Sequence, residues 1–193
     1  NETDVEVKLY ANGLEVASTT IPLLENGTSV KVSLPWSVQQ WGIVNVTAYV
    51  VPVACEITLN NRASRATVAG IVHFYDDMES GTGSWQHSGA GDEWELGAPV
   101  VGPKRAHSGS SCWGTDLNGF YKNRADNYLY IQLPELPQHE FVYLAFYHWF
   151  EIELRKDGAR VEVNDSASGW SPVYPVLGPR YRNNAVLGKA WSG

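Results

Sequence analysis

The sequence is poor in several features that would place a chain in a functional class. It contains 2 cysteines and 1 methionine among 193 residues, and only 18% of its residues are charged. Two cysteines are too few for a disulfide scaffold and show no metal-ligand spacing, which leaves a disulfide between Cys55 and Cys112 and two buried thiols both open. No hydrophobic run approaches the roughly 20 residues that cross a bilayer, and no signal peptide opens the chain.

The charge balance and the periodicity exclude further classes. A net charge of −7 and a pI near 5.2 argue against a nucleic-acid or anionic-membrane surface and are compatible with cation binding. No apolar pattern of helical period and length is present. The sequence instead contains 12% aromatic residues, 8 Trp and 18 Gly, a composition that suits short strands joined by tight turns.

The first third of the chain predicts a small antiparallel sandwich. Apolar and polar residues alternate over residues 5–10, Asn12-Gly13 supplies a type I′ hairpin turn, and a returning strand follows. Alternation returns over residues 29–36 and 42–51, and a further turn precedes residues 64–70. Short strands with turn signals at this spacing are typical of an immunoglobulin-like sandwich. We therefore expect such a domain over residues 1–70.

The same residues resemble a known family. The pieces LYANG, SVKVSLPW and VTAYVVPVACEITLNNRAS are similar to the CARDB module, a cell-adhesion-related sandwich of bacteria and archaea. This resemblance implies a non-catalytic repeat in a secreted or surface protein. The strand pattern alone implies only the fold.

Residues 71–193 predict a second all-β domain that follows without a long linker. Strands are expected over residues 127–133, 141–154 and 159–163, with Asp157-Gly158 as a hairpin turn between the last two. The segment FVYLAFYHWFEIEL, residues 141–154, is long and aromatic. It predicts a central strand with both faces covered, as in a two-sheet jelly roll.

Three segments of this second part carry another resemblance. YDDMESGTGSWQHSGAGDEWELG, HSGSSCWGTDLNGFY and VYLAFYHWFEIE are similar, in order and spacing, to MAM-like jelly-roll modules attached to secreted peptidases of the immune inhibitor A and bacillopeptidase F type. Such modules continue through further strands, so the resemblance implies an incomplete jelly roll. Because an open edge and an uncovered apolar face are unfavourable, we expect another protein segment or chain to complete the sheet.

The acidic turn at residues 76–79 is the leading candidate for a metal site. On an extended strand Asp77 and Glu79 point to the same side, and Ca²⁺ prefers six to eight hard oxygen ligands. The second resemblance implies a bound cation at this pair, with Asp92 and Asp116 as further ligands. The alternative is a solvated acidic turn that caps a strand. We expect a structural calcium ion.

The candidate enzymatic chemistry rests on two glutamates. Glu151 and Glu153 lie on one face of the expected strand, about 7 Å apart by the strand rise, and paired acids are required for glycoside hydrolysis. Arg155 follows where a third acid would stand, and a salt bridge or a role as a second set of cation ligands explains the pair more simply. No nucleophile elbow, zinc-binding helix or cysteine–histidine constellation is present. We therefore predict no catalytic residue.

Exposed aromatic residues and sequons suggest recognition outside the cell. Four aromatic residues in loop-like, polar stretches could form a carbohydrate-binding platform: Tyr121, Trp170, Tyr174 and Tyr181. Four Asn-x-Ser/Thr sequons could carry glycan in a secreted protein: Asn1, Asn26, Asn45 and Asn164.

The sequence therefore favours a non-catalytic, extracellular or cell-surface module for adhesion, assembly or binding, stabilised by calcium. Surface glycans are possible ligands, and neither nucleic acid nor membrane insertion is expected. Two alternatives stay open. One is the accessory C-terminal region of a secreted peptidase whose catalytic domain lies outside this chain. The other is a jelly-roll glycoside hydrolase or carbohydrate-binding domain.

Overall fold

The protein is all-β, as the sequence predicts. The computed structural model describes the chain except residues 40, 54–57, 137–140, 166, 186–187 and 193, and gives no side-chain description at 58 and 183–185. The chain divides into two compact units, Asn1–Ile71 and Val72–Gly193. In the described ranges no helix is long and apolar enough to cross a membrane.

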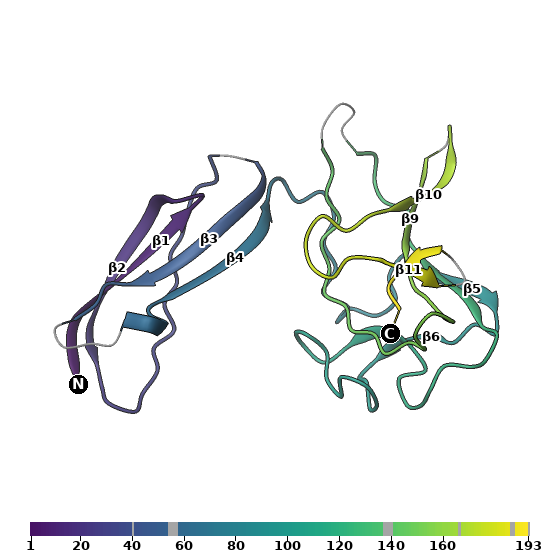
Figure 1. Cartoon of the computed structure of the whole chain (residues 1–193), viewed down its shortest axis with the longest axis horizontal. Helices are drawn as coiled ribbons and strands as arrows, with labels where there is room; N and C mark the ends of the chain where they lie inside the picture. Colours follow the sequence, from purple (N-terminus) through teal and green to yellow (C-terminus); the bar gives the residue numbers. More distant parts are fainter. Residues whose placement is uncertain (40, 54–57, 137–140, 166, 186–187, 193) are drawn as a thin grey trace. The chain divides into compact units, whose positions relative to one another are not determined.

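The first unit is built on an antiparallel sheet. Its strands in the described residues are β1 (Glu2–Ala11), β2 (Leu14–Leu24), β3 (Gly42–Val50) and β4 (Arg62–Ala69), with a short 3₁₀ turn η1 (Thr58–Asn60). The strands lie in the order β2-β1-β3-β4 (Figure 1). Asn12 and Gly13 both have positive φ angles, of 49° and 85°. A type I′ turn needs positive φ at both central residues, so this pair closes the predicted hairpin.

One face of this sheet carries a small apolar core. Val44 on β3 is only 1% exposed and clusters with Ala11 and Ala69, and Trp36 packs against the cluster. Trp36 lies in the stretch 29–36, where the prediction of a strand is wrong, since those residues form no strand in the structure. The stretch contributes a core side chain without adding a strand to the sheet.

The two outer strands of the sheet are protected against pairing with other strands. β2 contains Pro22, which has no backbone N–H to donate. β4 carries Arg62 and Arg65, and charged side chains on an edge strand oppose edge-to-edge association.

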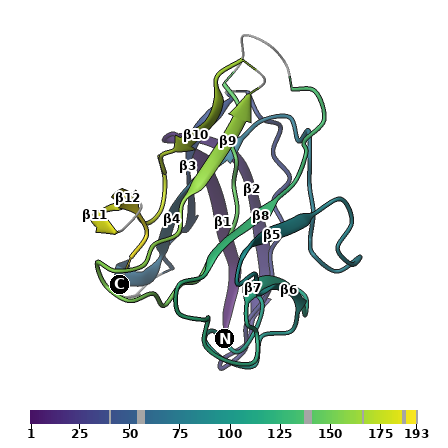
Figure 2. The same cartoon turned by 90° about the vertical axis from the view of Figure 1, so that its right-hand side faces the viewer.

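The second unit contains shorter strands. They are β5 (Gln86–Ala90), β6 (Trp94–Gly97), β7 (Cys112–Thr115), β8 (Asp126–Tyr130), β9 (Val161–Asp165), β10 (Gly169–Val173), β11 (Arg182–Ala185) and β12 (Gly188–Ala190). Within the described ranges they pair two by two and antiparallel, as β5-β8, β6-β7, β9-β10 and β11-β12 (Figure 2). β8 and β9 confirm two of the expected strand regions. The immunoglobulin-like and jelly-roll arrangements stay predictions.

Residues 141–154 differ most from expectation. No strand forms there, and the expected hairpin at Asp157-Gly158 is wrong: the chain turns at 154–156, and β9 pairs with β10 instead. The two faces of the segment nevertheless have neighbours. Phe146 and His148 contact the ring of Trp191, with centroid distances of 6.1 and 4.2 Å. On the other face Tyr147 stacks on His107 at 3.4 Å.

These contacts leave the segment largely uncovered. Phe141 is 94% exposed, and Leu144 and Trp149 remain more than half exposed. A strand needs hydrogen-bonding neighbours on its edges as well as side-chain contacts on its faces. Within the described residues no strand pairs with this segment, so a strongly β-prone sequence lies outside every sheet.

Candidate functional site

The acidic turn of the second unit is held by its own carboxylates. Asp76 Oδ1 accepts a hydrogen bond from the backbone N–H of Met78 at 2.8 Å, and its Oδ2 accepts one from the indole N–H of Trp85 at 3.0 Å. Asp77 Oδ1 accepts one from the backbone N–H of Glu79 at 3.1 Å. Both aspartates therefore form local turns that bond to backbone two residues on, a common use of this side chain.

Glu79 joins this turn to a distant loop. Its carboxylate accepts hydrogen bonds from the backbone N–H groups of Ser110 and Ser111, at 2.9 and 2.7 Å, and from the Ser110 hydroxyl at 2.6 Å. We call these three residues the Glu79 clasp. Gly109 lies beside it with a φ of 62°, and a Cβ atom there would lie 2.5 Å from Glu79 Oε1, so a larger residue would force the clasp to shift.

The clasp changes the chemistry of Glu79. The hydrogen bond from the Ser110 hydroxyl, followed by those from the Ser111 and Ser110 N–H groups, lowers the pKa of the carboxyl below its usual value. The carboxylate therefore stays ionised at neutral pH. Three of its roughly four lone-pair positions are occupied, which leaves little capacity for a metal ion unless the clasp opens.

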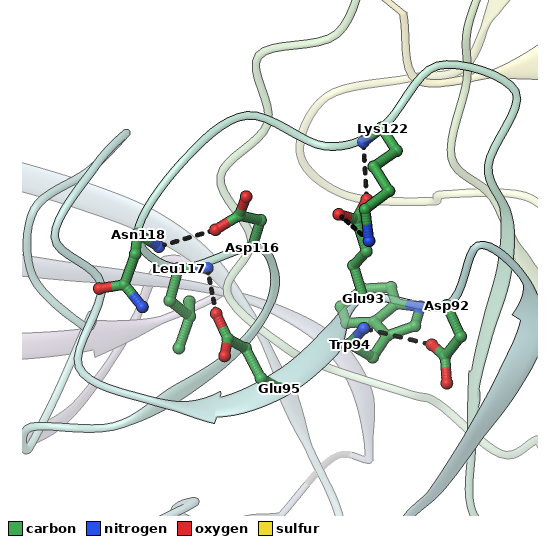
Figure 3. A network of polar contacts seen from close by, with 8 residues as sticks. All are labelled: Asp92, Glu93, Trp94, Glu95, Asp116, Leu117, Asn118 and Lys122. Atoms are coloured by element: carbon green, nitrogen blue, oxygen red, sulfur yellow. Dashed lines mark hydrogen bonds and ion pairs between the residues drawn. The ribbon is translucent and has the colours of Figure 1, made fainter.

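The other two expected calcium ligands are also engaged with neighbours. Asp92 Oδ2 lies 2.6 Å from His87 Nδ1, and Asp92 Oδ1 accepts a hydrogen bond from the backbone N–H of Trp94. Asp116 Oδ1 accepts one from the backbone N–H of Asn118 at 3.2 Å. Figure 3 shows that both carboxylates point to partners within their own loops.

Two glutamates between these aspartates complete the network. The backbone N–H of Leu117 donates to Glu95, which ties the loop after β7 to β6 (Figure 3). Glu93 accepts a hydrogen bond from the backbone N–H of Lys122 at 2.6 Å and pairs with its ammonium group at 3.1 Å. The backbone hydrogen bond from Lys122 is the main reason that the pKa of Glu93 is lowered. The carboxylates of this network therefore hold the neighbouring loops in place by accepting hydrogen bonds from the loop backbone.

These positions bear on the expected calcium ion. Among the described residues, no group of three or more His, Cys, Asp or Glu side chains lies together as a metal site would require. The four expected ligands Asp77, Glu79, Asp92 and Asp116 are thus not gathered into one shell. Calcium stabilisation stays a prediction from the resemblance.

Glu151 and Glu153 do not form a catalytic pair on a strand. Both side chains are exposed and lie in the non-strand segment before the turn. Glu153 Oε1 forms an ion pair with Lys156 at 2.6 Å, the simpler role that the sequence also allows.

The four aromatic residues expected at a sugar platform have different surroundings. Trp170 is 60% exposed on β10. The hydroxyl of Tyr121 donates to Asp157 at 2.8 Å and accepts from the backbone N–H of Glu153, a bracing role inside the unit. Burial is the main cause that raises the pKa of Tyr121.

The remaining two, Tyr174 and Tyr181, come together at a pocket. Their rings meet edge to face with centroids 5.7 Å apart. With Pro175, Arg180 and Lys189 they line a cavity of about 250 Å³. A second cavity of about 340 Å³ shares Arg180 and Tyr181 with the first, and its other lining residues are Phe150, Pro179, Arg182, Trp191 and Ser192. We call the two together the aromatic pocket.

Sequence reasoning did not single out the serines of the clasp or the cations of the pocket. Both serines donate backbone N–H groups, for which no side-chain pattern is informative, and the Ser110 hydroxyl adds a bond that depends on the fold bringing two distant loops together. Arg180 and Lys189 had a visible signal: basic residues recur near the end of a chain whose net charge is −7.

The cysteine and sequon predictions lie partly outside the described residues. Cys55 is one of those not described; Cys112 on β7 is a half-buried free thiol, and burial raises its pKa. The asparagines of all four sequons are exposed, namely Asn1, Asn26, Asn45 and Asn164. Ser166, the third residue of the last sequon, is not described.

Comparisons with known proteins agree with the first resemblance. Residues 1–63 match the CARDB family model, which confirms that resemblance for most of the first unit. The chain is also similar to Bacillopeptidase F of Bacillus subtilis (strain 168), with 32% identity over 125 residues. That similarity covers 64% of this chain and 8% of the relative, so the chain spans a small part of that protein's length. No solved structure matches the chain.

Proposed function

We propose that this chain is a non-catalytic, extracellular accessory region that serves assembly or adhesion. The CARDB match over residues 1–63 supports a module of that kind. The chain resembles a small fraction of a protein named as a peptidase, while its own sequence carries no catalytic motif. An accessory region of a longer peptidase-like protein is therefore the setting that we propose, and four sequons whose asparagines are exposed fit an extracellular location.

The observation that carries this proposal is the exposed, extended segment of residues 141–149. Its sequence, FVYLAFYHW, contains neither proline nor a carboxylate, lysine or arginine. Contacts with Trp191 and His107 hold the segment in place on its two faces. Its apolar side chains nevertheless face water, and large exposed apolar patches mark interaction sites.

The occupant that fits this segment is an extended strand of protein. An extended backbone outside any sheet can accept a strand through main-chain hydrogen bonds, and alternate side chains then give specificity. The source that we propose is a second copy of this chain, which offers the same extended segment. Pairing there would complete the sheet expected for the second unit.

The association state tests this proposal. We expect light scattering after size exclusion to show species above the 21.3 kDa of one chain, in proportions that rise with concentration. Leu144→Lys should shift the population toward the monomer, because a charge on the segment opposes strand addition. Val100→Lys is the matched control, since Val100 is equally exposed at 62% but lies elsewhere in the unit.

Two results would count against it. A monodisperse 21.3 kDa species at every concentration contradicts assembly through this segment. Association that Leu144→Lys leaves unchanged would place the contact on another surface. Hydrogen exchange gives an independent reading: amides of residues 142–149 should exchange fast in the monomer and slowly in the assembly.

A further inference from the structure

The aromatic pocket carries a concentration of positive charge that the acidic composition does not suggest. Arg180 lines both cavities, Lys189 lines the first, and Arg182 lines the second. The Lys189 ammonium group lies 5.6 Å from the centre of the Tyr174 ring, a cation–π distance. Three cations thus surround two tyrosines in a chain whose net charge is −7.

These cations are available for a ligand. Within the described part of the chain, none of the three forms an ion pair with an acidic side chain. Glu162, the acid near Tyr181, already forms an ion pair with Arg160 at 2.6 Å. The local field therefore favours an anionic group inside the pocket.

The aromatic walls of the pocket are held in place before a ligand arrives. The hydroxyl of Tyr181 accepts a hydrogen bond from the backbone N–H of Val161 at 2.8 Å, and its ring meets Trp191 edge to face at 4.9 Å. The indole N–H of Trp191 donates to the carbonyl of Pro179 at 2.9 Å. Side chains fixed in this way lose little entropy on binding.

We propose that the aromatic pocket binds an acidic saccharide, a sugar ring that carries a carboxylate. Arg180 lines both cavities, so its guanidinium would bind the carboxylate, and Lys189 would add a second charge. Tyr174 is 53% exposed, so its ring offers an apolar surface to the C–H face of a sugar.

The dimensions favour a saccharide over an acidic peptide. Cavities of about 250 and 340 Å³ accommodate one or two rings and stand at the small end of ligand sites. An acidic peptide would use the cations but would leave the tyrosine faces without a flat partner. Binding of an acidic peptide as strong as that of the acidic sugar would therefore show that the pocket recognises negative charge alone.

The experiment compares three probes on the full 193-residue chain by isothermal titration calorimetry. They are a galacturonic acid trimer, a neutral glucose trimer and a glutamate trimer. We expect the galacturonic acid trimer to bind, with an affinity that falls as salt is added, and the other two to bind at least about tenfold more weakly. Arg180→Gln and Tyr174→Ala should each weaken the binding, the first by about tenfold or more.

Lys156→Gln is the control variant, because Lys156 is an exposed cation whose ammonium group pairs with Glu153 and which lines neither cavity. Its affinity for the galacturonic acid trimer should equal that of the wild type. Thermal melts of each variant separate a lost site from a lost fold. Equal binding of the glutamate trimer, or unchanged binding in Arg180→Gln, overturns the proposal, and so does the absence of binding by the acidic sugar. None of these outcomes depends on the association state that tests the proposed function.

Discussion

Replacing Gly89 by alanine is the sharpest test of the second unit's backbone. Gly89 lies in β5 opposite Asn127 of β8 and has a φ angle of 126°, which residues with side chains rarely adopt. A Cβ atom at this position would overlap the carbonyl oxygen of Asp126 and lie 2.9 Å from the Asn127 Cα. Both neighbours are backbone atoms, so no side-chain rotation can relieve the contact.

The expected cost follows from two contributions. The unfavourable φ costs on the order of 1–3 kcal/mol, and each ladder hydrogen bond lost when the strands separate adds about 1 kcal/mol. Gly89→Ala should therefore destabilise the unit by about 3 kcal/mol or more. Gly169→Ala is the matched control: Gly169 also has a positive φ, of 73°, but a Cβ there meets nothing within 4 Å. Its cost should be about 1 kcal/mol.

Differential scanning calorimetry of the two variants measures the difference. At about 3 °C per kcal/mol, Gly89→Ala should lower the midpoint of the second unit by roughly 10 °C and Gly169→Ala by roughly 3 °C. Equal midpoints in the two variants would refute the reasoning, because the close approach of β5 and β8 would then contribute nothing. The transition of the first unit serves as an internal reference.

Three further predictions concern the core, the clasp and calcium. Val44→Ala removes two buried methyl groups and should lower the free energy of unfolding of the first unit by about 2–3 kcal/mol, measured in urea. Ile43→Ala, at a position 44% exposed, should lower it clearly less. Equal losses of stability in the two variants would place the core elsewhere. The pKa of Glu79 is lowered in the folded state, so its stabilisation is present above the usual value of 4.5 and is lost as the pH falls through the folded pKa. Thermal melts below pH 4.5 should therefore fall more steeply for the wild type than for Glu79→Gln, and parallel curves would contradict the clasp. Millimolar calcium should raise the melting midpoint relative to excess chelator, because a bound ion adds about 2.7 kcal/mol of stability at 100 times its dissociation constant. Asp77→Asn should abolish that rise. An unchanged wild-type midpoint refutes the calcium prediction.

The first unit was predictable where local chemistry decides the structure. Asn12-Gly13 specifies a hairpin because few residue pairs accept two positive φ angles. The alternation over residues 42–51 correctly places Val44 in the core, but further along β3 it is Thr47 that is buried and Ala48 that is exposed. The stretch 29–36 alternates equally well and forms no strand. Alternation indicates which side chains are buried, and Trp36 does pack against the core. The alternating pattern does not reveal whether a neighbouring strand is available for pairing.

The second unit shows the same limit more strongly. Residues 141–154 have the composition of a central strand, yet strand formation depends on partners far along the chain or outside it. The acidic turn was visible as a set of carboxylates. Their actual partners, such as Ser110 and the indole of Trp85, follow from loop positions that no spacing rule encodes.

The pocket was half predictable. Tyr174 and Tyr181 stand in polar stretches, which favours exposure, and the structure brings these two together. Trp170 and Tyr121 satisfy the same criterion and do not line the pocket, because one lies on β10 and the other braces Asp157. Sequence position near turns predicts accessibility; only the fold decides which accessible rings share one cavity.

The contrast between protected and unprotected edges affects how readily this chain aggregates during synthesis and storage. The outer strands of the first unit are blunted by Pro22 and by Arg62 and Arg65, while residues 141–149 have neither device. Uncharged, proline-free, aromatic segments of six or seven residues are the type that form cross-β fibrils. We therefore expect the yield of the isolated chain to fall as its concentration rises, unless the strand that we propose pairs with this segment first.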